Sequence, residues 1–160
     1  MRPVYRIGLR HKRVICIEHW PSWEAFDALR PEPRTFPSDL AYSDGEVRLH
    51  DLSGTCFELQ RLRVNNGGLA AAKQLLAEDV AMWRAAGAQV IGRFEVVHGH
   101  DLPALLLLLN WESAERAAEA GREIESSTAL NEKRQQDRLA SGRAAIRASS
   151  RVLGCTLCLE

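Results

Sequence analysis

The spacing of apolar residues after residue 54 changes along the chain, and each spacing is typical of one kind of element. The run Cys56–Val64 contains no Gly or Pro and predicts a strand. After a turn over residues 65–68, apolar residues recur at steps of three and four, which predicts a helix that ends near Gly87. The members of this stripe are Leu69, Ala72, Leu76, Val80 and Trp83.

The remaining pattern completes a familiar order of elements. Residues 89–97 and 105–111 predict two strands joined by a polar hairpin loop. Ser113 is a candidate N-cap with Glu115 in the first turn, and the Ala-, Glu- and Arg-rich stretch beyond predicts two helical pieces, the second over residues 130–139. Residues 151–159 predict a closing strand. This order, βαββαβ, is that of a ferredoxin-like unit, an α+β fold with an antiparallel four-stranded sheet and its helices on one face.

The first 53 residues carry a shorter version of the same pattern. Residues 4–9 and 14–19 predict a hairpin, residues 46–52 predict a closing strand, and the prolines of residues 30–37 exclude a long helix. A W-x-S-x-E pattern follows a strand twice, at Trp20, Ser22 and Glu24 and again at Trp111, Ser113 and Glu115. We therefore divide the chain into a partial ferredoxin-like repeat over residues 1–53 (strand, strand, short helix, strand) and a complete domain over residues 54–160. A chance match of a short capped helix after a strand is the alternative interpretation.

One face of the predicted sheet has no helix to cover it. Residues 105–109 and 152–159 make this face apolar, and an exposed apolar sheet needs a cover. A second copy of the sheet is the simplest cover, so we expect a homodimer formed through the sheet faces. The sequence leaves open whether residues 1–53 pack on their own chain or swap across such a dimer.

Composition and charge narrow the class of protein. The 160 residues carry no net charge, which disfavours a nucleic-acid partner, because phosphate binding draws on a surplus of Lys and Arg. No apolar run reaches the ~20 residues of a membrane-spanning helix, so no membrane association is expected. The four cysteines lie in apolar runs, which favours reduced thiols in a cytoplasmic protein. Three lysines beside many Arg and Ala residues indicate a bacterial gene.

Several residues could carry chemistry, and most have a structural interpretation that is favoured. His98 and His100 beside Asp101 have the character of metal ligands, but a third and fourth ligand are missing, so turn residues and no metal site are expected. Cys155 and Cys158 have redox spacing, yet three residues apart in a strand they face opposite sides, which favours packing.

A basic stretch near the C-terminus has two interpretations. Four-residue spacing places pairs of its arginines on one helical face, where they could contact an anion, although a solvated, salt-bridged face is favoured. Its members are Arg134, Arg138, Arg143, Arg147 and Arg151, with Lys133 and the opposing Asp137. No phosphate-binding loop, dinucleotide fingerprint, zinc-protease motif or nucleophile elbow occurs, so no cofactor is expected from motifs.

The second unit resembles the NIPSNAP family of dimeric α+β barrel proteins over about residues 55–160. The resemblance rests on the strand residues 57–64, on residues 83–88 and 91–94, on the hairpin glycine Gly99 and on residues 107–113. It implies a sheet-to-sheet homodimer with a small-molecule pocket between each sheet and its helices, and the related barrels include cofactor-free monooxygenases and haem-handling proteins. Phe57, Gln60 and Leu62 depart from the polar residues that the family often has there, which disfavours catalysis.

Two functions follow as hypotheses. In the first, the protein binds a small apolar molecule between sheet and helices, with cofactor-free oxidative or haem-related chemistry as the finer expectation. The residues expected to line that pocket are Trp83, Glu95, His98, Asn110 and Trp111, and Glu58 is a further polar group on a strand. In the second, the protein is a non-catalytic interaction module. A cavity with convergent polar groups favours the first hypothesis, and a filled interior favours the second.

Overall fold

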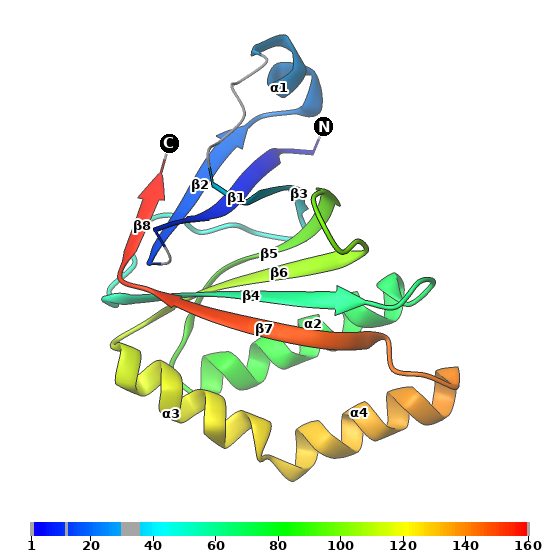
Figure 1. The fold of residues 1–160 in the computed structure, drawn as a ribbon. Coiled ribbons are helices and arrows are strands. Elements are labelled where there is room, and N and C mark those ends of the chain that lie inside the picture. The colour runs from blue at the N-terminus through cyan, green and yellow to red at the C-terminus, as the bar shows by residue number, and fades with distance from the viewer. Residues whose placement is uncertain (1, 12, 30–35, 160) are drawn as a thin grey trace.

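The computed structural model describes residues 2–11, 13–29 and 36–159, and Figure 1 shows how their elements are arranged. The first unit contributes β1 (Val4–Arg10), β2 (Val14–Trp20), α1 (Trp23–Leu29) and β3 (Ser38–Ser43). The second unit contributes β4 (Cys56–Val64), α2 (Leu69–Ala85), β5 (Gln89–His98), β6 (Ala104–Trp111), α3 (Ala114–Glu125), α4 (Thr128–Ser141), β7 (Ile146–Gly154) and β8 (Thr156–Leu159).

The second unit has the predicted ferredoxin-like arrangement. Strands β7, β4, β6 and β5 pair antiparallel in that order and form the C-terminal half-sheet. Helices α2, α3 and α4 all lie on one side of it (Figure 1). The predicted apolar stripe is the face that α2 buries, since Ala72, Leu76, Val80 and Trp83 are its buried residues. The α+β fold class predicted from the sequence is confirmed.

The serine of each W-x-S-x-E pattern caps a helix. The Oγ of Ser22 accepts a hydrogen bond from the backbone N–H of Ala25 at 3.2 Å, at the start of α1. The Oγ of Ser113 accepts one from the backbone N–H of Arg116 at 3.1 Å, at the start of α3. Each serine satisfies a donor that the first turn of a helix leaves without an intrahelical partner.

The first unit continues the same sheet and folds over its helix-free face. β3 pairs antiparallel with β5, and the order continues as β3, β1, β2 and β8, which we call the N-terminal half-sheet. Figure 1 shows this half-sheet on the side of β4–β7 opposite to the helices. Its inward side chains pack with those of the C-terminal half-sheet in one core, which includes Tyr5, Ile7, Ile15, Ile17, Leu59, Phe94, Leu106 and Leu108.

This packing changes the argument for a dimer. Within one chain, residues of β1, β2 and β3 cover the apolar face for which a second copy was the expected cover. The homodimer stays a prediction, but a bare apolar sheet no longer supports it. In this single chain, the described part of residues 1–53 packs on the second unit of the same chain.

The third predicted strand of the first unit lies elsewhere in the sequence. Residues 46–52 form no strand, and the strand of this region is β3 at Ser38–Ser43. Residues 44–52 instead run beside β5, where the backbone N–H of Arg48 donates to the carbonyl of Ile91 at 2.7 Å. The apolar side chains that suggested a strand, Val47, Leu49 and Leu52, pack against the core between the half-sheets. Most of the predicted proline loop, residues 30–35, lies outside the described residues.

The predicted closing strand at residues 151–159 is two strands. β7 begins earlier, at Ile146, and the chain turns at Gly154 so that β8 pairs in parallel with β2. A Cβ at Gly154 would lie 2.7 Å from the carbonyl oxygen of Arg13, so the backbones approach too closely there for a side chain. The N–H of Cys155 donates to the same carbonyl at 3.1 Å. In the described part of the chain, no helix is long and apolar enough to span a membrane.

Candidate functional site

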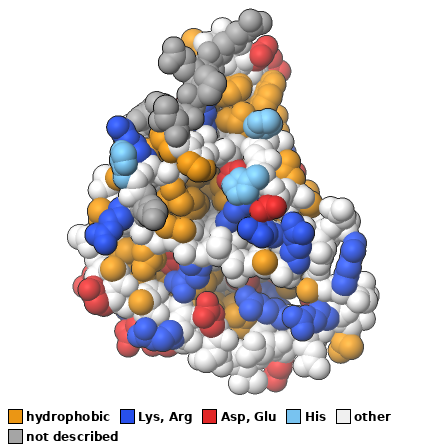
Figure 2. Space-filling model, viewed as in Figure 1, with side chains coloured by type: hydrophobic (Ala, Val, Ile, Leu, Met, Phe, Trp, Pro, Cys, Tyr) orange, Lys and Arg blue, Asp and Glu red, His pale blue; other side chains and the backbone are white. Residues whose placement is uncertain are grey.

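A large cavity lies between the two half-sheets. Its volume is about 1030 Å³, and its walls come from β1, β3, β4, β6, β7 and the segment before β3. The apolar lining residues are Ile7, Leu9, Phe36, Pro37, Leu59, Leu106 and Val152, and the polar ones are Arg10, His11, Ser38, Asp39, Arg61, His100 and Ser150. In Figure 2, hydrophobic side chains gather on one face of the molecule with Lys, Arg and His side chains beside them.

Strand alternation explains the apolar walls. Successive side chains of a strand point to opposite faces, so Ile7 and Leu9 of β1 face the same way, as do Leu59 and Arg61 of β4. Gly8 stands between the two β1 residues. A Cβ there would lie 2.6 Å from the carbonyl oxygen of Pro37, so a glycine lets the segment before β3 pass close to β1. That close passage brings Pro37 to the cavity wall.

The main polar group in the wall is an ion pair between the two half-sheets. Arg61 donates to the carboxylate of Asp39 on β3 and to the backbone carbonyl of His100. The two side chains are only 11% and 12% exposed. Burial raises the pKa of Asp39 above its ordinary value, although the charges of Arg61 and His100 act in the opposite direction. Among the described residues, the Oδ1 of Asp39 and the Nε of Arg61 are buried without a hydrogen-bond partner.

The five residues predicted to bind a ligand do not meet in this cavity. Trp83 and Trp111 lie together in the core under the helices, with ring centroids 6.0 Å apart in an edge-to-face arrangement. Glu95 pairs with Lys73 of α2, and His98 is exposed at the end of β5. Asn110 accepts from the N–H of Gly54 at 2.8 Å and donates to two carbonyls, so it fixes the segment before β4.

The space between sheet and helices around Trp83, where the ligand was expected, is nearly filled. The hollow beside Trp83 has a volume of only about 30 Å³, the volume of about one water molecule in the liquid. A ligand pocket needs roughly ten times that volume. Among the described residues, the large apolar cavity therefore lies on the other side of the sheet from the one that the sequence suggested.

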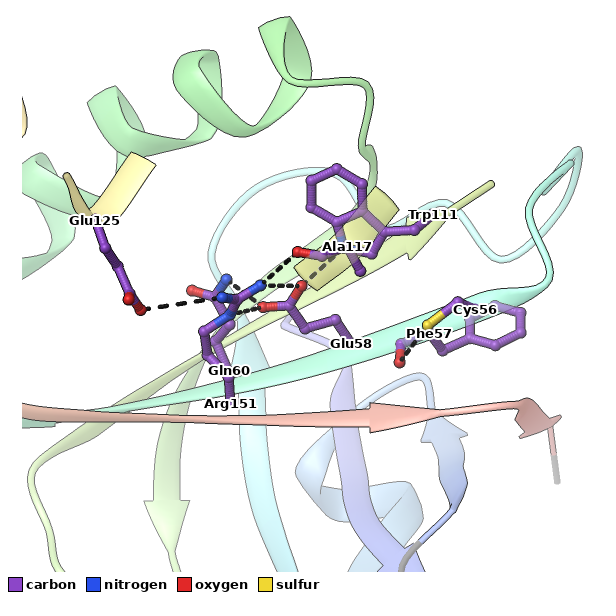
Figure 3. Close-up of polar contacts among 8 residues, drawn as sticks. All are labelled: Cys56, Phe57, Glu58, Gln60, Trp111, Ala117, Glu125 and Arg151. Carbon is purple, nitrogen blue, oxygen red and sulfur yellow. Dashed lines mark hydrogen bonds and ion pairs between the residues drawn. The ribbon is translucent and has the colours of Figure 1, made fainter. Parts of the chain in front are cut away.

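Glu58 is held in a buried polar network, drawn in Figure 3. The carboxylate is 0% exposed and accepts hydrogen bonds from Arg151 at 2.5 and 3.0 Å. It also accepts from the indole N–H of Trp111 and from the side-chain amide of Gln60, both at 2.7 Å. The guanidinium of Arg151 lies 5.1 Å from the ring centroid of Trp83 and donates to the carbonyl of Ala117. These bonds join β4 to β6 and β7 through Glu58, and Arg151 extends the network to α3. Both carboxylate oxygens of Glu58 are therefore engaged in structural contacts.

The remaining candidates are dispersed. Asp101 pairs with Arg63 at 3.1 Å, and the described residues contain no group of three or more metal-ligating side chains. Cys155 lies at the bend between β7 and β8, whereas Cys158 lies in β8 opposite Cys16 of β2.

Sequence reasoning missed Asp39 and Arg61, which stand 22 residues apart in different units. The only local signal is the alternation in β4, which places Arg61 on the face of Leu59.

Comparisons with known proteins address the fold. No protein-family model and no curated protein sequence matches the chain. A protein from Fusobacterium nucleatum, provisionally named a monooxygenase, has a similar structure with a TM-score of 0.52 at 8% identity, over 95% of this chain and 74% of that one. A NIPSNAP family protein from Agrobacterium tumefaciens is similar over 68% of this chain and 91% of its own, with 18% identity and a TM-score of 0.49.

A third similar structure is a ferredoxin-fold protein from Listeria monocytogenes, described as related to antibiotic biosynthesis monooxygenases. It has 8% identity and a TM-score of 0.46, and the match covers 96% of this chain and 92% of that one. NIPSNAP proteins are therefore among the structures similar to this chain, as the sequence resemblance suggested. At these identities the likeness concerns the fold alone. The strand order and pairing, together with the Fusobacterium structure, show the ferredoxin-like α+β fold.

Proposed function

We propose that the protein binds a small, largely apolar molecule in the cavity between its two half-sheets. The observation that carries this proposal is the cavity itself, at about 1030 Å³. Pockets that hold drug-sized ligands measure about 300–1000 Å³ and combine apolar walls with a few placed polar groups. Aliphatic side chains of β1, β4, β6 and β7 supply such walls, and the pair of Asp39 and Arg61 supplies a fixed polar group.

The wall favours a ligand with an apolar body. Leu106 is 1% exposed and Leu59 is 9% exposed, so both are held firmly by the surrounding core. A molecule that enters the cavity against this wall removes its apolar surface from water, which is the main favourable contribution to such binding. A filled interior would have favoured the non-catalytic interaction module, so the cavity supports ligand binding as the better of the two hypotheses.

Oxidative chemistry is the finer proposal. The provisional name of the Fusobacterium protein supports a monooxygenase-like reaction. A haem-related role has a different support, because His11 and His100 both line the cavity and imidazole is a common axial ligand of haem iron. The two finer roles predict different measurements, namely oxygen uptake with an apolar substrate and a shifted Soret band on addition of haem.

Binding is tested with N-phenyl-1-naphthylamine, a neutral probe whose fluorescence rises in apolar surroundings, and with native mass spectrometry of the purified protein. We expect one probe per chain. Val152→Phe places a ring in the cavity wall and should weaken probe binding about tenfold or more, which corresponds to ~1.4 kcal/mol.

The matched control is Val97→Phe. Val97 is a half-buried strand valine like Val152, but it does not line the cavity, so this variant should bind the probe as the unmodified protein does. A protein that binds neither the probe nor haem and carries no extra mass would refute the proposal and favour the interaction module. Equal weakening by both substitutions would place the probe outside the cavity.

A further inference from the structure

Three arginines surround a small hollow between α4 and β7, on the helix side of the sheet. Arg134 and Arg138 stand on α4, and Arg147 stands near the start of β7. The hollow has a volume of about 160 Å³ and is closed at its base by Leu75, Leu130 and Ile146 among others. Figure 2 shows Lys and Arg side chains gathered on this side of the molecule, below the strands of the C-terminal half-sheet.

These three arginines have no counter-charge. None of them forms a hydrogen bond, an ion pair or a ring contact with any residue that the structure describes. Some arginines elsewhere in the second unit have such partners, as Arg151 does with Glu58 and Arg116 with Glu119. The other cation at the hollow, Lys133, is already paired with Glu78 at 2.8 Å and with Asp79 at 3.0 Å.

The carboxylates at the hollow do not neutralise the arginines. Asp79 is occupied by Lys133, and the Oδ2 of Asp137 accepts the backbone N–H of Ala145 at 2.8 Å. Asp137 therefore fixes the connection that turns at Gly142, where φ is 72°, and holds the start of β7 beside α4. The lining contains four cationic side chains against these two carboxylates.

Like charges in this arrangement repel one another. Positions 134 and 138 are one helical turn apart, where two cations destabilise the helix, and the turn at Gly142 adds Arg147 from the strand. An oxyanion at the centre would convert this repulsion into attraction, since guanidinium groups donate paired hydrogen bonds to phosphate oxygens.

We propose that this hollow is a binding site for one phosphate group of a small molecule. Its volume of about 160 Å³ accommodates a compact oxyanion and no extended chain. A protein without net charge is poorly suited to a nucleic acid or an anionic membrane, both of which present many phosphates over a wide surface. The site is separate from the proposed apolar cavity, which lies on the other face of the sheet, and neither proposal depends on the other.

Isothermal titration calorimetry with inorganic phosphate, and then with phenyl phosphate, tests the site on the full chain. Arg138→Gln removes one of the three guanidinium groups from an exposed position, so the fold should persist, which circular dichroism checks. We expect at least about tenfold weaker binding of phosphate, because a hydrogen bond to a charged group contributes that much or more. Arg134→Gln should act in the same direction.

The matched control is Arg122→Gln, which removes the same charge from the exposed surface of α3 away from the hollow. It should change phosphate affinity less than twofold. Equal weakening by Arg122→Gln and Arg138→Gln, or no saturable binding of either probe, would overturn the proposal. Tighter binding of a DNA oligonucleotide or of phosphatidylserine vesicles than of phenyl phosphate would overturn the small-molecule assignment. Preference for inorganic phosphate or for phenyl phosphate would support free phosphate or a monoester, respectively.

Discussion

The buried pair of Glu58 and Arg151 gives the sharpest stability prediction. Glu58→Gln keeps the shape of the side chain but removes the charge that faces the guanidinium. The Glu58 carboxylate is 0% exposed and the Arg151 side chain only 23%, so water cannot take over the lost contact fully. Breaking such a pair by removing one partner costs about 3–5 kcal/mol. Domains of ordinary size have a total stability of about 5–15 kcal/mol, so this loss is a large part of it.

A double-mutant cycle separates the pair from its surroundings. Arg151→Met leaves the Glu58 carboxylate buried without its cation, although Trp111 and Gln60 still donate to it, and we expect a similar loss. The double variant Glu58→Gln, Arg151→Met leaves neither charge uncompensated, so its loss should be clearly smaller than the sum of the two single losses. Urea unfolding followed by tryptophan fluorescence measures all four proteins, and Trp111 itself lies in the network.

Glu132→Gln is the control, because Glu132 is exposed on α4, and its unfolding midpoint should stay where it is. A loss below about 1 kcal/mol for Glu58→Gln would refute the reasoning, since it would match a weakly held surface pair and not a buried one. Additive single losses would show that Glu58 and Arg151 act independently.

Three further predictions test other parts of the structure. Gly54→Ala should lower the unfolding free energy by about 3 kcal/mol or more, because its Cβ would lie 1.9 Å from the carbonyl oxygen of Trp111. The Cβ of Gly87→Ala meets no atom within 4 Å, so this variant should lose only about 1–2 kcal/mol because of its positive φ. Urea denaturation in which Gly87→Ala is the less stable of the two would contradict this. Ser113→Ala removes the N-cap of α3 and should cost about 1 kcal/mol, measured in the same assay; an unchanged midpoint would count against the cap. Burial raises the pKa of Asp39 in the folded protein, so protonation of Asp39 stabilises the fold. This stabilisation is complete below the ordinary pKa of 3.8 and is lost as the pH rises through the raised pKa. The unfolding free energy of the unmodified protein relative to Asp39→Asn should therefore fall with pH over that window, and a rise would mean that Arg61 outweighs burial.

The repeat in the first 53 residues illustrates what a local pattern can and cannot predict. The serines of both W-x-S-x-E patterns cap helices, because capping depends only on residues within one turn. The strand expected at residues 46–52 does not form. Residues 44–52 run beside β5 beyond the end of β3, and their apolar side chains reach the core without a regular ladder. Apolar content alone does not distinguish a strand from an extended segment that packs on a core.

The candidate site depended on contacts that no local pattern encodes. Trp83 is buried as its place on the apolar helix stripe suggested, and Asn110 and Trp111 are buried too. These residues serve packing and backbone anchoring under the helices. Asp39 and Arg61 meet only because β3 extends the sheet beyond β5 and the N-terminal half-sheet folds over the other face. The three unpaired arginines were visible in the sequence as a basic stretch, but the turn at Gly142 decides that Arg147 joins Arg134 and Arg138.

The sequence by itself determined the elements of the second unit and their ferredoxin-like order, because side-chain periods of about 3.6 and 2 report directly which face of a helix or strand is buried. Only the tertiary structure decided what covers the helix-free face, where the chain keeps an open cavity, and that residues 151–159 divide into β7 and β8. Those features arise from contacts between residues far apart in the chain. Their formation depends on how the two half-sheets fit together across a core. The spacing of apolar residues within one strand or helix does not indicate that fit.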